Sequence, residues 1–336
     1  MLHFTLSPGE RDQTRAAVSG LAPGLDALAE RSGTELFQEL PVAARRLPER
    51  LLRFLDAFRR EEPAGGFVLG GWTVDDDELG PTPAHWRRPA GTAGAASVHE
   101  LYLLLVASVL GDVFAWSTVQ DGSLVQDLMP VRGEELEKNA GSSASVLDLH
   151  TEDAFSALRC DYLGLLCLRN DDRVPTVYAP FDPARLSREQ RRILSEPRYL
   201  LLPDEEHLRR AAERGEEPPA PPRTGVLFGG DSTPYLAFDE YFIETGPEDE
   251  EARAALAALT GQLQRSRSDV ALAPGDLLMV DNYRSVHGRQ PFPARYDGRD
   301  RWLKRVSVTR DLRRSRAARV DAGSPVVLTG LAATLG

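Results

Sequence analysis

The chain has few cysteines, no long apolar run and little clustered positive charge. Its only two cysteines, Cys160 and Cys167, are seven residues apart, so on one strand their side chains would point to opposite faces. We therefore expect two buried free thiols instead of a disulfide or a zinc pair, as in a reducing cytoplasm. The most apolar run, Leu101–Leu110, is about half as long as the roughly 20 residues that cross a bilayer, which predicts a buried helix and no contact with a membrane.

The acidic balance of the chain argues against nucleic acid as a partner. Asp and Glu total 51 against 40 Lys and Arg, for a formal net charge of −11, and the only basic cluster, Arg310–Arg319, lies near the C-terminal end. Such a surface lacks the basic stripe that displaces phosphate counterions. Met1 leads into the charged residues Glu10, Arg11 and Asp12, which indicates no secretory signal and a cytoplasmic location. We expect a small molecule as the partner, and the sequence leaves the oligomeric state open.

The first third of the chain, residues 1–116, has a mainly helical pattern. Leucines and phenylalanines recur every three or four residues over Arg45–Arg60, which is typical of an amphipathic helix. The strongest helix pattern covers Ser97–Trp116, with Ser97 as the N-cap and Glu100 completing a capping box. Between these helices, an apolar run bounded by glycines over Gly65–Gly71 predicts a buried strand.

From about Ser145 the pattern changes to short strands separated by turns. This spacing favours a β-sandwich or a jelly roll, and helices in front of strands would pack as one α+β unit. We expect a single domain over residues 1–336, with the strand-rich core at 117–313 and a C-terminal extension at 314–336. The expected strands cover residues 146–150, 162–168, 176–179, 225–228, 235–238, 277–280 and 302–309.

The segment 205–223 interrupts these strands with many charges and four prolines, Pro218, Pro219, Pro221 and Pro222. Because it has little apolar surface to bury, we expect an exposed loop. Long loops inside a domain are often functional, so this one is a candidate lid over a site. A plain surface insertion explains the composition equally well.

The first chemical motif is His150-Thr151-Glu152. On a strand, or at its end, this spacing places an imidazole and a carboxylate on the same face. Two histidines and one carboxylate on one side of a metal form the facial triad of non-haem iron(II) oxygenases, which leaves open positions for substrates. Taken alone the motif is weak, because the chain has six histidines among 51 acidic residues. A hydrogen-bonded core histidine is the alternative.

The second motif is the block Asp281–Arg289, which contains His287 and follows a predicted strand. Fourteen residues beyond His287 lies Arg301. A 2-oxo acid with a distal carboxylate needs a planar cation that bonds both oxygens, which arginine provides better than lysine. The alternative for Arg301 is a surface ion pair with Asp297 or Asp300.

Four stretches together resemble the clavaminate synthase-like 2-oxoglutarate oxygenases, a group that includes asparagine, arginine and lysine hydroxylases. The likeness runs from about Trp116 to Asp311, and the helical front third matches only in general character. The order, spacing and flanks of the four stretches make the resemblance specific. They are Leu149–Phe155, Asp161–Asn170, Val280–Asn282 with Val286–Arg289, and Asp300–Leu303.

The resemblance implies a double-stranded β-helix (jelly roll) flanked by helices. It implies iron(II) held by His150, Glu152 and His287, with 2-oxoglutarate and O₂ as cosubstrates. Arg301 would grip the distal carboxylate of 2-oxoglutarate, and Thr176 would hydrogen-bond it.

For the substrate, the resemblance implies that Arg305 and Gln120 bind the α-carboxylate of an amino acid. Ser142 and Ser143 are weaker candidates for its α-amine. Ordinary hydrogen bonding within loops is the alternative for Gln120 and both serines.

One departure from the family concerns the side chain of the substrate. Members that act on arginine or lysine tend to carry two acids, two residues apart, in the stretch that matches Thr233–Tyr241. This chain has Asp239 but Tyr241 in the second place, and Glu240 would point to the opposite strand face. A buried unpaired charge is costly, so we expect only a slight preference for a polar or basic side chain.

The resemblance implies hydroxylation of an unactivated carbon, most commonly C3, of a free or carrier-bound L-amino acid in the biosynthesis of an antibiotic. The same iron and cosubstrate also support a desaturase or cyclase. A non-catalytic jelly roll that binds a small ligand is the rival from another class. A zinc hydrolase fits less well, because it has no role for an arginine at the position of Arg301.

Overall fold

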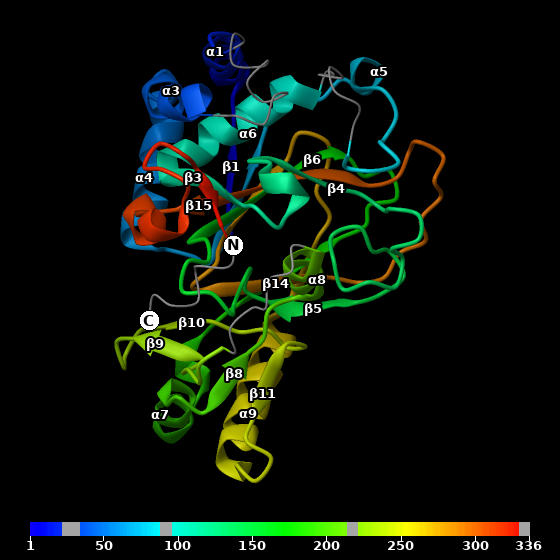
Figure 1. Ribbon diagram of the computed structural model, residues 1–336. Helices are drawn as coiled ribbons and strands as arrows, with labels where there is room; N and C mark the ends of the chain where they lie inside the picture. Colours follow the sequence, from blue (N-terminus) through cyan, green and yellow to red (C-terminus); the bar gives the residue numbers. More distant parts are fainter. Residues whose placement is uncertain (22–33, 88–95, 214–220, 329–336) are drawn as a thin grey trace.

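The computed structural model describes residues 1–21, 34–87, 96–213 and 221–328. Two β-sheets form the centre of the molecule, with helices on their outer faces (Figure 1). This is the predicted jelly-roll architecture with flanking helices. The domain boundaries expected from the sequence stay a prediction.

The larger sheet has the strand order β1-β2-β13-β6-β15-β3-β16, and β4 also pairs with β15. Most neighbouring strands are antiparallel, while β1 pairs with β2 and β16 pairs with β3 in parallel. The bounds are β1 Leu2–Thr5, β2 Gly66–Gly70, β3 Asp112–Trp116, β4 Gln126–Leu128, β6 Tyr162–Arg169, β13 Leu277–Asp281, β15 Trp302–Thr309 and β16 Val326–Val327.

The smaller sheet has the order β12-β7-β14-β5, and its strands pair antiparallel. Two short ribbons, β9 with β10 and β8 with β11, lie beyond it (Figure 1). The bounds are β5 Leu147–His150, β7 Thr176–Pro180, β12 Ser268–Val270, β14 Ser285–Arg289, β8 Tyr199–Leu201, β9 Leu227–Gly229, β10 Pro234–Leu236 and β11 Ile243–Thr245.

The central strand β6 explains why its sequence is apolar throughout. Tyr162, Leu166 and Leu168 pack toward the N-terminal helices, whereas Leu163 and Cys167 belong to the core on the opposite face. Side chains alternate along a strand, so a strand covered on both faces needs apolar residues at every position. Strand β6 therefore lies between two apolar cores, one on each face of the larger sheet.

Helices cover both outer faces. Four of them, α1 Pro8–Ser19, α3 Thr34–Ala44, α4 Glu49–Glu61 and α6 Ala96–Leu110, form one core with the larger sheet. Two others, α7 Arg188–Ser195 and α9 Glu250–Ser266, pack on the smaller sheet. The remaining helical segments are α5 Asp76–Leu79, α8 Glu205–Glu213, η2 Gln120–Gly122, η3 Pro183–Arg185 and η4 Leu312–Ala318.

Two predicted helix boundaries are wrong. The helix expected over Arg45–Arg60 begins at Glu49, directly after Pro48, since proline fits a helix start better than its interior. The helix expected over Ser97–Trp116 begins at Ala96, so Ser97 is not its N-cap, and it ends at Leu110.

Beyond this second helix the chain continues as β3. The break falls at Gly111, where a Cβ atom would meet the carbonyl oxygen of Thr309 on β15 at 2.3 Å. Only glycine allows strand β15 to approach so closely. The alternating residues that follow then pair with β15.

Two other predictions for loops and strands need correction. The segment 205–223 contains the helix α8, because the Asp204 side chain accepts a hydrogen bond from the His207 backbone N–H at 2.9 Å and so caps it. Residues 214–220, including Pro218 and Pro219, lie outside the described part of the chain. The expected strand over 235–238 ends at Leu236, so Asp239 lies beyond it in an isolated β-bridge and Tyr241 lies in a bend.

Both cysteines are free and buried, as predicted. Burial raises the pKa of the Cys167 thiol to about 12, and the pKa of Cys160 is also raised. Among the described residues, none of the helices combines the length and the apolar character that a bilayer crossing requires.

Candidate active site

The two histidines of the predicted triad face each other across the smaller sheet. His287 on β14 and His150 at the end of β5 are partners in the antiparallel register, and their ring centroids are 4.3 Å apart. Both side chains point into the space between the sheets, because the preceding residue on each strand, Leu149 on β5 and Val286 on β14, packs outward in the core that includes α9. Sheet pairing therefore brings together two residues that are far apart in sequence.

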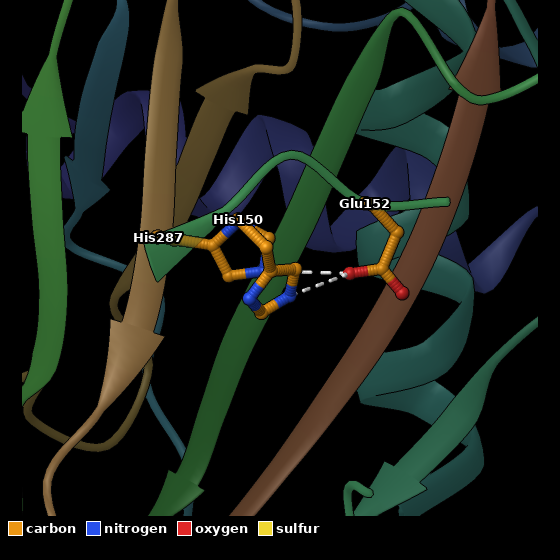
Figure 2. Close-up of side chains that lie close together, drawn as sticks. All are labelled: His150, Glu152 and His287. Atoms are coloured by element: carbon orange, nitrogen blue, oxygen red, sulfur yellow. Dashed lines mark ion pairs between the residues drawn. The ribbon is translucent and has the colours of Figure 1, made fainter. Parts of the chain in front are cut away.

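Glu152 follows β5 in a turn and reaches the same point. Its Oε2 atom lies 3.7 Å from Nε2 of His150 and 3.3 Å from Nε2 of His287 (Figure 2). The turn is fixed by Asn282, whose side chain is fully buried. The Asn282 Oδ1 atom accepts from the Glu152 N–H at 2.7 Å, and its amide donates to the carbonyls of Glu152 and Cys160.

This donor set fits a single metal ion. Each of the three residues offers one ligand atom, and these atoms all lie within 4.8 Å of one another. Adjacent ligands of one first-row ion lie about 3 Å apart, since each bond is about 2.1 Å long. The 2.8 Å contact between His150 Nδ1 and the Asp148 carbonyl fixes the proton on Nδ1 and leaves the Nε2 lone pair for a metal. Two imidazoles and one carboxylate match the iron(II) facial triad.

The second oxygen of Glu152 is held by Arg305, whose Nη1 donates to Oε1 at 2.6 Å. Burial alone would raise the pKa of Glu152, but Arg305 and the two histidines hold it well below its usual range. The carboxylate is thus charged and free to bind a metal through Oε2.

Arg301 and Thr176 meet at one end of the same pocket. The Arg301 Nη2 atom donates to Thr176 Oγ1 at 2.9 Å, and both residues are buried and line the pocket. Burial lowers the pKa of Arg301 to about 10, so it remains charged at neutral pH. Asp297 and Asp300 do not pair with it. Their carboxylates instead accept from backbone groups of the 295–300 turn.

The predicted α-carboxylate contacts are only partly brought together. Arg305 lines the pocket, and its Nε donates to the Gln126 side chain at 2.6 Å. Gln120 does not line the pocket, because its amide is engaged with the backbone N–H and carbonyl of Asp127. The sequence pointed to Gln120 and missed Gln126. The substrate role of Gln120 stays a prediction.

The two serines suggested for the α-amine also lie outside the pocket lining. Ser142 donates to the Asn139 carbonyl and accepts from Arg289 Nη2 at 2.7 Å. The Ser143 carbonyl and N–H are bonded to Phe292 and Glu135. Their role toward a substrate stays a prediction that this arrangement does not favour.

Asp239 and Tyr241 both line the pocket. Asp239 pairs with His150 in an isolated β-bridge, and burial raises the pKa of its carboxyl, against the effect of the His150 charge. Tyr241 is 55% exposed and lies against Lys138, at 4.5 Å from ammonium to ring. Glu240 points away and accepts from Gln264 on α9, as its place on the opposite face predicted.

A neighbouring cluster was not predicted from the sequence. His207 of α8 contacts Asp153 through Nε2 at 3.2 Å and Thr118 through Nδ1 at 2.7 Å, and Trp116 donates to the other oxygen of Asp153. Asp153, Asp204 and His207 form a second group that could hold a metal. Both ring nitrogens of His207 are already hydrogen-bonded, which fits an anchor for α8 better than a metal site. Only the Asp-x-x-His spacing signalled it.

Comparison with known proteins agrees with this geometry. Residues 209–307 match the family described as "Taurine catabolism dioxygenase TauD, TfdA family". Enduracididine beta-hydroxylase of Streptomyces hygroscopicus is 38% identical, over 94% of this chain and 98% of that protein. L-ornithine/L-arginine 3-hydroxylase of Catenulispora acidiphila is 39% identical, over 89% and 94%. Clavaminate synthase 2 of Streptomyces clavuligerus is 32% identical, over 81% and 83%.

Solved structures show the same fold. The non-heme iron oxygenase OrfP in complex with Fe and alpha-ketoglutaric acid (2-oxoglutarate) superposes with a TM-score of 0.88 at 40% identity, covering 97% of this chain and 99% of OrfP. OrfP with Fe and L-Arg gives a TM-score of 0.84 at 37% identity, covering 97% and 100%.

Proposed function

Because the chain belongs to the clavaminate synthase-like iron(II)- and 2-oxoglutarate-dependent oxygenases of the TauD/TfdA family, we propose that it hydroxylates C3 of a free L-amino acid with a positively charged side chain. The observation that carries the proposal is the convergence of His150, Glu152 and His287 in the pocket that Arg301 and Thr176 also line. Two of the relatives are named as hydroxylases of such amino acids, enduracididine in one and L-ornithine and L-arginine in the other, which supports a basic substrate.

The charges around the pocket support a cationic substrate. Its lining includes Glu206 on α8, Asp204 directly before α8, and Asp239 in the isolated bridge after β10. None of these three carboxylates forms an ion pair among the residues that the structure describes. Asp204 and Asp239 accept only backbone N–H groups, and burial raises the pKa of Glu206. A guanidinium or ammonium group would be attracted by these half-buried carboxylates, which form no ion pair with a described residue.

Two acids at the start of α8, Asp204 and Glu206, thus compensate for the missing acid at Tyr241. The family resemblance implied only a slight preference for a polar or basic side chain of the substrate, because Asp239 is the one acid at the two matching positions. With Asp204 and Glu206 on the same pocket wall, the preference for a basic side chain is stronger.

Arg305 supports a free amino acid over a carrier-bound one. Its Nε and Nη1 atoms are held by Gln126 and Glu152, which fixes the guanidinium plane and leaves Nη2 for a substrate carboxylate. A carrier thioester has no free α-carboxylate and would leave this buried cation with one donor unused.

When bound, iron(II) supplies O₂ activation coupled to oxidative decarboxylation of 2-oxoglutarate. The chain supplies the rest. Arg301 and Thr176 hold the distal carboxylate of the cosubstrate, Arg305 holds the α-carboxylate of the amino acid, and the acids of the far wall hold its side chain. These contacts determine which carbon of the substrate faces the metal ligands. The protein thus contributes to catalysis by orienting the substrate.

A panel of free L-amino acids tests the proposal, with anaerobically loaded iron(II), 2-oxoglutarate and O₂. We expect L-arginine or a similar basic amino acid to stimulate succinate formation and to gain one oxygen atom at C3, shown by mass spectrometry and NMR. The same amino acid as a carrier thioester should be a poor substrate.

The variant Glu206→Gln should raise KM for the basic substrate about 10-fold, as expected for a lost charge-assisted bond. Glu205→Gln on the exposed face of α8 is the matched control and should change little. A product two hydrogens lighter would identify a desaturase or cyclase instead. Absence of succinate across the panel would favour a non-catalytic binding protein.

A further inference from the structure

A second arginine, Arg289, lies at the Arg301 end of the pocket. It follows His287 by two residues on β14 and therefore points to the same interior face. Gly288 pairs with Val177 on β7, so the next position on β7, Thr176, lies beside Arg289. Thr176 also accepts the hydrogen bond from Arg301. Three anion-binding groups from three strands or strand ends thus meet around one place.

Both guanidiniums are buried without a counter-ion. Arg289 is 6% exposed and Arg301 is 8% exposed, and both line the pocket. Neither forms an ion pair with any carboxylate in the described part of the chain. Three of the acids that line the pocket are engaged elsewhere, with Asp148 on Lys138, Glu152 on Arg305 and Asp153 on His207. The other three, Asp204, Glu206 and Asp239, form no ion pair with either arginine.

The hydrogen bonds of Arg289 leave much of its guanidinium unused. Nη2 donates to Ser142 Oγ at 2.7 Å, the group lies over the Phe292 ring at 5.1 Å, and the buried Nε has no hydrogen-bond partner in the structure. The Nε of Arg301 is likewise buried and unpartnered. Two like charges side by side in a buried site are unfavourable unless an anion lies between them.

We propose that Arg289 is a second binding residue for the distal carboxylate of 2-oxoglutarate and that, together with Arg301, it makes the site selective for 2-oxo acids with two carboxylates. The inference rests on the proposed function, since it needs 2-oxoglutarate as the cosubstrate. The hydroxyl of Ser142 accepts a hydrogen bond from Arg289, and the hydroxyl of Thr176, beside Arg289 in the sheet, accepts one from Arg301. A carboxylate there would receive donors from two directions.

The proposal is tested by comparing the affinities of the unmodified protein and of an Arg289 variant for two ligands, one with the distal carboxylate and one without it. Dissociation constants are measured by anaerobic calorimetry with the iron(II)-loaded protein for 2-oxoglutarate and for 2-oxopentanoate, in which a methyl group replaces the distal carboxylate. In Arg289→Gln we expect 2-oxoglutarate to bind about 10- to 100-fold more weakly, the range for a lost hydrogen bond to a charged group. The affinity for 2-oxopentanoate should change less than about 3-fold.

An equal loss for both ligands, or no loss for either, would overturn the proposal, because a merely structural arginine has no reason to distinguish them. If the glutamine variant does not fold, Arg289→Met carries the same expectation and the same refutation. Arg301→Gln is the positive control. Should it lose the preference for 2-oxoglutarate while Arg289→Gln keeps it, this inference fails and the proposed function stands. Equal binding of both ligands by the unmodified protein would instead refute the proposed function.

Discussion

Replacing Asn282 with alanine should weaken metal binding without removing any metal ligand. The Asn282 side chain bonds the backbone N–H and carbonyl of Glu152 and the carbonyl of Cys160, and its amide also contacts the Cys160 Sγ atom at 3.5 Å. Without it, the Glu152 carboxylate loses the backbone anchor that points Oε2 toward the two histidines.

The expected magnitude follows from the groups left unpaired. Three buried backbone groups lose their partner, namely the N–H and carbonyl of Glu152 and the carbonyl of Cys160. Each costs about 1–3 kcal/mol when left unsatisfied, so we expect the free energy of unfolding to fall by at least about 3 kcal/mol. Residues that orient metal ligands typically contribute about 10- to 100-fold in metal affinity, and we expect a loss in that range.

Asn170 offers a matched control. It is also a buried asparagine, 5% exposed. Its side chain accepts a hydrogen bond from the backbone N–H of Val174 and donates to the carbonyls of Val174 and Leu272. It does not line the pocket. Asn170→Ala should therefore lose similar stability in urea unfolding, yet keep its affinity for iron(II) in anaerobic titration. If Asn282→Ala also kept the unmodified affinity to within 2-fold while losing stability, Asn282 would not position Glu152.

Three further outcomes are expected. Cys160 and Cys167 should not react with a thiol reagent at pH 8 in the native state and should both react in urea; rapid native labelling would contradict their burial. Burial raises the pKa of Asp281 to about 7 from an ordinary value near 3.8, so stability should fall as the pH rises between these values, and Asp281→Asn should remove that slope. An identical slope in the variant would refute this role. His207→Ala should free α8 and speed proteolysis at 205–213, whereas His85→Ala, on an exposed loop, should not.

The sequence predicted best what depends on local spacing. His150 and Glu152 are two residues apart at a strand end, and this local pattern brings their side chains to one face. The apolar run of β6 likewise followed from a strand covered on both sides. The distant ligand His287 required the family resemblance, because strand register depends on pairing over more than a hundred residues.

What the sequence did not reveal depends on tertiary contacts. Gly111 ends α6 because β15 passes within contact distance, and nothing within the helix itself signals this. The composition of 205–223 suggested a loop, yet the Asp204 cap and the buried His207 form a helix there. Asn282 lies in a stretch that carries the family resemblance, but its role could not be inferred from the sequence, since its hydrogen-bond partner Glu152 lies 130 residues away.

A diffraction measurement at the iron absorption edge, on crystals grown anaerobically with iron(II), tests the metal site most directly. The arrangement of the side chains predicts one anomalous peak within bonding distance of Nε2 of His150, Oε2 of Glu152 and Nε2 of His287, and its loss in His287→Ala. A peak at the Asp153–Asp204–His207 cluster instead, or no peak at the triad, would contradict the assignment of this pocket as the iron centre.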